Sequence, residues 1–199
     1  MKEEKKKHPI IKFIIIFILI IAAILLYSRF IATKGLATKE YKITSSSIQD
    51  NFHGFKIVHI SDVHYGRTTD KKDLNNMVKE VNLLKPDIVV LTGDLIDKDT
   101  KLDDILKGEI SEALNSINAN VGKYAISGNH DNNFSEWESI INDGGFKNLN
   151  DTYELIYNDG YTPILLAGLS SKLNNQIDIT DRYNKILVYS STENIKEWY

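Results

Sequence analysis

The sequence predicts an α/β domain built around a parallel β-sheet and preceded by a transmembrane helix. Two observations predict this fold class: one long apolar stretch near the N-terminus, and beyond it short apolar runs that alternate with segments of helical periodicity. Strands that alternate with helices are typical of parallel βαβ units. The 199 residues carry a formal net charge of -3, so the composition indicates a globular protein and gives no basic surface for nucleic acid.

The apolar stretch comes first along the chain. Residues 13–26 contain no charge, and Lys12 and Arg29 flank them. A span over residues 9–31 meets the roughly 20 residues that a helix needs to cross a bilayer. A buried core helix is one alternative, disfavoured by an apolar surface on all sides. A cleaved signal peptide is another, disfavoured by the length of the run and the lack of an Ala-x-Ala site.

We therefore expect an uncleaved, single-pass anchor in a cell membrane. The lysines before the span slightly outweigh the basic residues after it, which puts residues 1–8 in the cytoplasm and the domain outside. Residues 32–51 are polar and predict a linker, with one early strand near residues 41–43. The globular domain is expected over residues 52–199.

Within this domain the elements follow from periodicity and from residues that end helices. Apolar residues at three- and four-residue steps predict a helix near residues 72–84, which Pro86 ends. The remaining elements are predicted in the same way: strands at 56–60, 87–91 and 123–127, a helix within 102–117, a short helix near 135–141, and strands within 146–157, 162–170 and 185–189.

Polar clusters follow each of the first three strands: "SDVH", "TGDLID" and "SGNHD". Sites in α/β sheets form outside the carboxyl ends of the strands. Asp62 and His64 are two residues apart, so an extended backbone would point both side chains to one side. Gly93 and Gly128 remove side-chain bulk and let the chain turn sharply.

The chemistry of these clusters indicates metal ions. Cys is absent, so a metal would be bound by Asp, His or Asn, a ligand set that suits Mn, Fe or Zn. Two ions can clamp a phosphoryl group and lower the pKa of a bound water to give a hydroxide nucleophile. Asp94 is the natural bridge between them, because a carboxylate has two oxygens.

The ordered set Asp-x-His, Gly-Asp-x-x-Asp and Gly-Asn-His-Asp resembles the calcineurin-like metallophosphoesterase superfamily. "FKIVHISDVHYGR" and "KPDIVVLTGDLID" are similar to its bacterial membrane-associated phosphohydrolases, and the likeness covers roughly residues 52–169. It implies an αββα sandwich that hydrolyses a phosphomonoester or phosphodiester with two divalent ions. On the matching positions, Asp62 and His64 would bind the first ion, Asp94 would bridge, and Asn129 would bind the second.

The resemblance also implies catalytic roles. His130 would steady the phosphate and protonate the leaving oxygen, and Asp97 would orient its imidazole. Arg67 is a candidate contact to the substrate phosphate, with a structural or surface role as an equal alternative. Lys98 stands where phosphatase relatives often have Arg, so specificity for monoesters is not supported.

Other polar residues near these blocks have simpler interpretations. His59, inside a strand, is expected to be packed or hydrogen-bonded rather than a metal ligand. The aspartates at positions 99, 103 and 104 are expected to form a solvated helix start.

The family's later blocks, a His after a later strand and a Gly-His-x-His, are not found in the sequence, in which no His follows His130. The second ion would keep only Asp94 and Asn129 as ligands, too few for tight binding. We therefore expect an incomplete second sheet in a C-terminally truncated domain. Three hypotheses stay open: an extracytoplasmic hydrolase, a catalytically inactive membrane-tethered fragment that binds one metal weakly, and a non-enzymatic anchor or scaffold.

Overall fold

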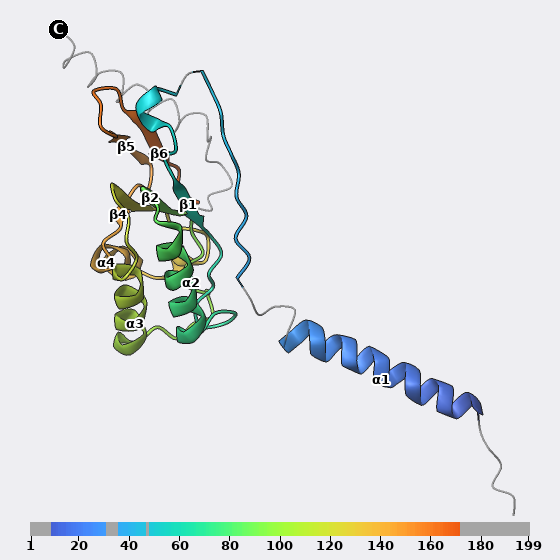
Figure 1. The fold of residues 1–199 in the computed structure, drawn as a ribbon. Coiled ribbons are helices and arrows are strands. Elements are labelled where there is room, and N and C mark those ends of the chain that lie inside the picture. The colour runs from blue at the N-terminus through green and yellow to red at the C-terminus, as the bar shows by residue number, and fades with distance from the viewer. Residues whose placement is uncertain (1–8, 31–35, 47, 172–199) are drawn as a thin grey trace, which may run out of the picture. The chain divides into compact units, whose positions relative to one another are not determined.

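The computed structural model describes residues 9–30, 36–46 and 48–171, and the chain divides into two compact units, residues 1–43 and 44–199. In the first unit, α1 covers Pro9–Phe30, which confirms the predicted helix (Figure 1). Its segment Ile10–Ser28 has a mean hydropathy of 3.1 and none of it is buried. By length and composition this one helix is apolar enough to cross a membrane.

The strand predicted near residues 41–43 is wrong. Residues 36–46 form no helix or strand, and the side chains of Tyr41 and Ile43 are 78% and 79% exposed. A strand needs a neighbour to satisfy its backbone N–H and C=O groups. No strand among the described residues pairs with this segment.

A parallel sheet forms the centre of the second unit. Its strands follow the order β1-β2-β3-β4. All three pairings are parallel, as the alternating sequence pattern predicts. The strands are β1 (Ile57–Ile60), β2 (Ile88–Leu91), β3 (Gly122–Ala125) and β4 (Lys147–Asn148).

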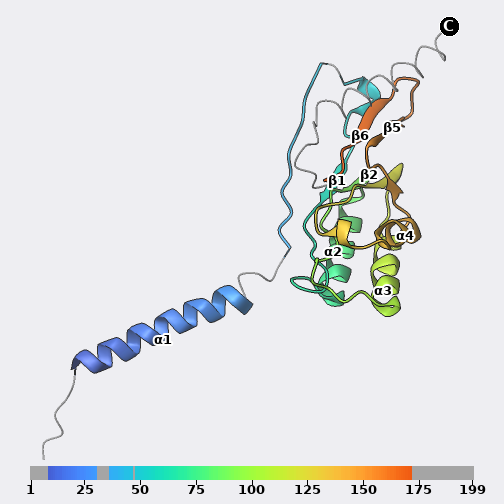
Figure 2. The same cartoon turned by 180° about the vertical axis from the view of Figure 1, so that it is seen from behind.

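Helices connect these strands and lie together on one face of the sheet (Figures 1 and 2). They are α2 (Lys71–Leu84), α3 (Asp104–Asn115) and α4 (Trp137–Asp143), with short 3-10 turns η1 at Asp50–Phe52 and η2 at Asp131–Asn133. The Asp103 side chain accepts the Leu106 N–H and caps α3, so this part of the predicted helix start is confirmed.

The larger core lies between the sheet and these helices. The apolar stripe of α2 is buried there, as its spacing predicts. α3 contributes Ile110 and Leu114, which have no exposed surface, and α4 contributes Ile141, also fully buried.

The other face of the sheet meets an antiparallel pair, β5 (Thr152–Ile156) and β6 (Ile164–Gly168). Ile88, Tyr124 and Ile156 form a smaller core there, while Ile57 stays 53% exposed and Leu165 38% exposed. Within residues 48–171 the second sheet has two strands, and no helix follows α4. The predicted α/β class is therefore confirmed, and the strand predicted at residues 185–189 lies outside the described residues.

Candidate metal centre and active site

The loops after β1 and β2 are joined through their backbones. We call this contact, between residues 62–66 and residues 93–97, the first junction. It consists of four backbone hydrogen bonds: Asp62 N–H to Gly93 O (3.2 Å), His64 N–H to Asp94 O (2.9 Å), Tyr65 N–H to Leu95 O (2.9 Å) and Asp97 N–H to Tyr65 O (3.1 Å). Because both loops leave the same edge of a parallel sheet, the fold brings the first two polar clusters side by side.

The loop after β3 meets the loop after β2 at a second junction, between residues 93–97 and residues 127–131. The backbone N–H of His130 donates to Asp94 Oδ1 at 2.9 Å. A Cβ on Gly93 would lie 2.4 Å from Gly128 N, and one on Gly128 would lie 2.2 Å from Asp94 Oδ1. The two glycines therefore let the backbones of the two loops approach each other. The sequence predicts sharp turns at these glycines but not this contact between loops.

Three predicted ligands converge at the first junction. Asp62, His64 and Asp94 each offer a ligand atom, and these atoms lie within 4.8 Å of one another. His64 Nε2 is 3.8 Å from Asp62 Oδ1 and 3.8 Å from Asp94 Oδ2. Two carboxylates and an imidazole nitrogen form a donor set that fits a divalent ion such as Mn, Fe or Zn.

The backbone route to this convergence differs from the sequence prediction. β1 ends at Ile60, and Asp62 and His64 have φ of 55° and 46°, with Asp94 at 52°. The expectation that an extended backbone aims Asp62 and His64 to one side is therefore wrong. The left-handed conformation curls the chain, and the hydrogen bonds of the first junction hold it in that shape.

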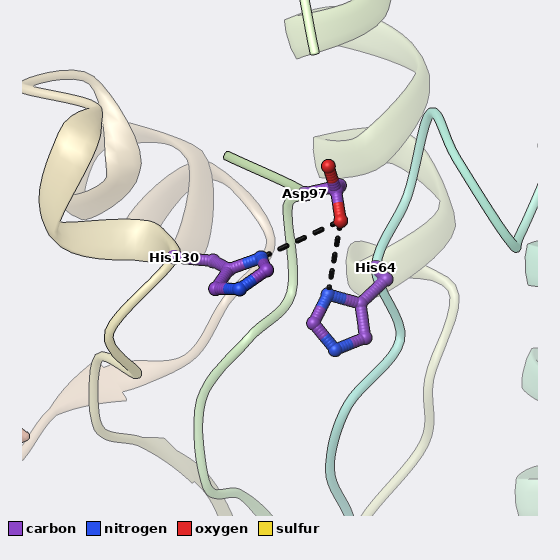
Figure 3. A group of neighbouring side chains, drawn as sticks. All are labelled: His64, Asp97 and His130. Atoms are coloured by element: carbon purple, nitrogen blue, oxygen red, sulfur yellow. Dashed lines mark ion pairs between the residues drawn. The ribbon is translucent and has the colours of Figure 1, made fainter. Parts of the chain in front are cut away.

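Asp97 lies at the centre of a second group, shown in Figure 3. Its Oδ2 atom is 3.4 Å from His130 Nδ1, 3.4 Å from His64 Nδ1 and 3.6 Å from Arg67 Nη1. The two imidazole rings stand edge to face, with centroids 4.6 Å apart. One carboxylate oxygen of Asp97 thus lies close to the Nδ1 atoms of both imidazoles. The other ring nitrogen of His64, Nε2, is a predicted metal ligand atom.

This arrangement keeps Asp97 ionised. Burial, with 1% of the residue exposed, acts to raise the pKa of its carboxyl group. The N–H of Asp99 and the electrostatic effect of the nearby Arg67, His130 and His64 side chains outweigh burial and hold the pKa below its ordinary value. An ionised carboxylate can hold the Nδ1 hydrogen of a histidine and fix its ring.

The remaining predicted residues lie around these groups. The backbone N–H of Lys98 lies 3.3 Å from His130 Nδ1, so Nε2 is the ring atom left to face a substrate. Arg67 is 62% exposed and stands at the solvent side of Asp97. Asn129 is exposed and sits in the second junction between Gly128 and His130. His59 Nε2 is 2.6 Å from Thr92 Oγ1, so the hydrogen-bonded histidine expected there is confirmed.

Sequence reasoning missed a support beneath the first junction. Tyr65 Oη donates to Glu109 Oε2 at 2.8 Å, and Lys71 Nζ lies 3.0 Å from Glu109 Oε1. Burial and the Glu109 carboxylate raise the pKa of Tyr65 to about 12. The contact depends on how α3 packs beside the loop, and no local pattern signals it. The sequence pattern also assigns no role to Asp131, the last residue of "SGNHD".

Comparison with known proteins agrees with a candidate site that could hold metal ions. A family model described as "Calcineurin-like phosphoesterase" matches residues 55–199. An "Uncharacterized metallophosphoesterase YkuE" of Bacillus subtilis is 33% identical over 144 residues, 71% of this chain and 47% of the relative. A "Transmembrane protein with metallophosphoesterase domain" of Danio rerio is 26% identical, covering 78% of this chain and 36% of the relative.

A third relative is named for an activity: a "UDP-2,3-diacylglucosamine pyrophosphatase LpxG" of Chlamydia muridarum is 37% identical over 81 residues, 41% of this chain and 24% of the relative. The chain spans about half or less of the length of these curated relatives.

Proposed function

Because the chain belongs to the calcineurin-like phosphoesterase family, we propose that it hydrolyses a phosphoric ester bond with divalent metal ions. The observation that carries the proposal is the convergence of Asp62, His64 and Asp94 beside a histidine, His130, that shares the Asp97 carboxylate with His64. Metal-dependent hydrolysis of a phosphoester uses metal ligands beside a general acid, and a carboxylate that contacts the acid can fix its orientation.

We propose two ions, of Mn, Fe or Zn. Asp62 and His64 would hold the first, Asp94 would bridge, and Asn129 would hold the second. Ions bound there would polarise a phosphoryl oxygen and lower the pKa of a bound water. Asp97 Oδ2 lies 3.4 Å from His64 Nδ1 and would favour the ring orientation in which Nε2 faces the two ligand carboxylates.

His130 is the proposed general acid. Its Nε2 would donate a proton to the leaving oxygen, and the ionised Asp97, whose Oδ2 lies 3.4 Å from His130 Nδ1, would stabilise the charged form of the ring. We propose that Arg67 contacts the substrate phosphate, since its guanidinium lies near Asp97 and is largely exposed.

A second candidate is a catalytically inactive, membrane-tethered chain that binds one metal ion. Its support is the unequal ligand supply among the described residues: the first ion would have three protein ligands, whereas the second would have Asp94 and Asn129. Two protein ligands are fewer than the usual three or four of a protein site.

We further propose that α1 anchors the chain in a cell membrane as a single span, with the N-terminus cytoplasmic and the domain outside. The supports are the apolar segment Ile10–Ser28 and the relative named as a transmembrane protein. Protease added to intact cells should remove an epitope tag at the C-terminus and spare one at the N-terminus. Protection of the C-terminal tag in intact cells would contradict this orientation.

The hydrolase proposal is tested with the full chain in detergent micelles containing Mn²⁺. Substrates are bis-p-nitrophenyl phosphate, p-nitrophenyl phosphate and, because a relative is named a pyrophosphatase, a sugar nucleotide. We expect metal-dependent turnover, reduced at least about 100-fold in Asp94→Asn, since a lost metal ligand removes the charge stabilisation. Asp99→Asn, an exposed aspartate nearby, is the matched control and should retain the activity.

Calorimetric titration with Mn²⁺ separates the candidates. Two bound ions with turnover support the hydrolase, and one bound ion without turnover supports the inactive chain. Absence of both binding and turnover contradicts both candidates and favours a scaffold.

A further inference from the structure

Asp131 follows His130 and is one of the few buried charged residues in the described chain, with 1% of its surface exposed. Both of its carboxylate oxygens are engaged by backbone N–H groups. Oδ1 accepts from Ile96 at 3.1 Å, and Oδ2 accepts from Gly128 at 2.8 Å. The two donors belong to different loops: Ile96 to the loop after β2, and Gly128 to the loop after β3.

The carboxylate of Asp131 depends on these two hydrogen bonds. Asp131 is buried, and no lysine, arginine or histidine of the described residues forms an ion pair with it. A buried carboxylate is costly unless hydrogen bonds replace its lost water. Two bonds from backbone N–H groups to a carboxylate meet that need and are stronger than bonds between neutral groups.

The bond to Ile96 distinguishes a tie between loops from a local turn. Asp131 and Gly128 are three residues apart, so the bond between them alone would only stabilise the turn that leads into η2. Ile96 is 35 positions away along the chain, between Asp94 and Asp97. The same carboxylate therefore connects both sides of the second junction.

We propose that Asp131 is a positioning residue that sets the separation and orientation of the two loops at the second junction. The close glycine backbones fix the shortest approach of the loops, and Asp131 prevents them from moving apart. The distance that is held in this way is the one between Asp94 and the pair Asn129 and His130. Asp131 itself contacts neither substrate nor metal in this scheme.

The consequence for metal binding rests on the proposed function, whereas the tie between the loops does not. Displacement of one loop by a fraction of an ångström moves Asn129 and His130 relative to the ligands on the other. Supporting residues of this kind change metal affinity by about 10–100-fold when they are replaced.

The test uses the full chain in detergent micelles and the variant Asp131→Asn. Asparagine keeps the shape but turns one acceptor oxygen into an NH₂ group that faces a backbone N–H. We expect Mn²⁺ binding at least about tenfold weaker, by the same reasoning. Amide hydrogen exchange at His130, whose N–H bonds to Asp94, should become faster, which reports the junction directly.

The control is Asp103→Ala. It also deletes a carboxylate that accepts a backbone N–H, at the start of α3, and should lower the melting temperature without changing Mn²⁺ binding or exchange at His130. If Asp131→Asn lowers the melting temperature but behaves like this control in both measurements, Asp131 only supports the fold and the proposal is overturned.

Two further outcomes are decided by exchange. If the unsubstituted chain binds no Mn²⁺, the proposed function fails for this chain, and the exchange at His130 still decides the tie. If Asp131→Asn does not fold, the unsubstituted chain serves instead. Ile96 and Gly128 amides that exchange as slowly as the strand amide of Leu91 support the tie, and exchange as fast as that of exposed loops overturns it.

Discussion

The two junctions that assemble the candidate site are built from different atoms. At the first junction, four backbone hydrogen bonds join the loops, and the side chains take no part in them. At the second, the contact depends on the carboxylates of Asp94 and Asp131 and on the missing side chains of Gly93 and Gly128. Substitutions should therefore leave the alignment of the first junction intact and disturb that of the second.

The largest effect is expected for Gly128→Ala, because the new Cβ would lie 2.2 Å from Asp94 Oδ1 and 2.3 Å from Asp94 N. We expect the free energy of unfolding in urea to fall by about 3 kcal/mol, the upper range for overpacking. Gly108→Ala is the matched control: no atom lies within 4 Å of its Cβ, and a gain of about 0.5–1 kcal/mol is expected in mid-helix. Equal stability of the two variants would show that the loops separate easily.

Asp97→Asn comes next, because Asp97 donates its N–H within the first junction and reaches His130 of the second with its carboxylate. Loss of the charge that holds His64 should weaken Mn²⁺ binding about 10–100-fold. Titration followed by electron paramagnetic resonance measures it, with Asp99→Asn as the control that retains the affinity. Unchanged affinity in Asp97→Asn would mean that His64 is fixed without this carboxylate.

Tyr65→Phe tests whether the first junction depends on side chains. The backbone bonds of Tyr65 remain, and only the bond from Oη to Glu109 is lost. Chemical denaturation should show a loss of about 1.5 kcal/mol, as for a hydrogen bond to a charged group. Mn²⁺ affinity should stay the same, and a large drop in affinity would show that the first junction also depends on side chains.

The smallest expected effect is the contribution of Glu109 to the pH dependence of the stability of the fold. Hydrogen bonds from Lys71 first, and then Tyr65, hold the pKa of the Glu109 carboxyl below its ordinary value. The unfolded chain therefore takes up this proton at a higher pH than the folded chain. The stabilisation is complete above the ordinary pKa of about 4.3 and is lost as the pH falls through the folded value.

Melting temperatures of the chain and of Glu109→Gln, measured from pH 7 to pH 3, test this dependence. The chain should be the more stable of the two near pH 7, and the difference should shrink below about pH 4. A difference that stays constant across this range would assign the effect of the substitution to packing.

Most of the described domain could be predicted from the sequence, because local patterns determine its helices and the order of its strands. The apolar stripe of α2 and the proline after it place that helix within one residue of the prediction. Strand ends were less accurate: the predicted strand 123–127 ends at Ala125, because the Ser127 N–H bonds to Asn150 Oδ1 in place of a strand partner. The strand expected near residues 41–43 is not formed, and among the described residues no strand pairs with this segment.

The candidate site divides in the same way. The three clusters could be located from the sequence, because parallel strands bring their carboxyl ends to one edge. The shared position of Asp97 between His64 and His130, and the tie formed by Asp131, arise from contacts between loops more than thirty residues apart in sequence, such as the 35 positions between Ile96 and Asp131. Motif spacing carries no information about such contacts.

The left-handed backbone at Asp62, His64 and Asp94 is unfavourable for the stability of the fold, but the same three residues supply the proposed metal ligand atoms. A residue with a Cβ in this conformation costs roughly 1–2 kcal/mol relative to glycine. Glycine at any of the three positions would relieve the local backbone and delete a proposed ligand atom in one step. A library of variants selected for heat resistance alone should therefore accumulate glycine there, and the most heat-resistant variants would lack the proposed metal ligands.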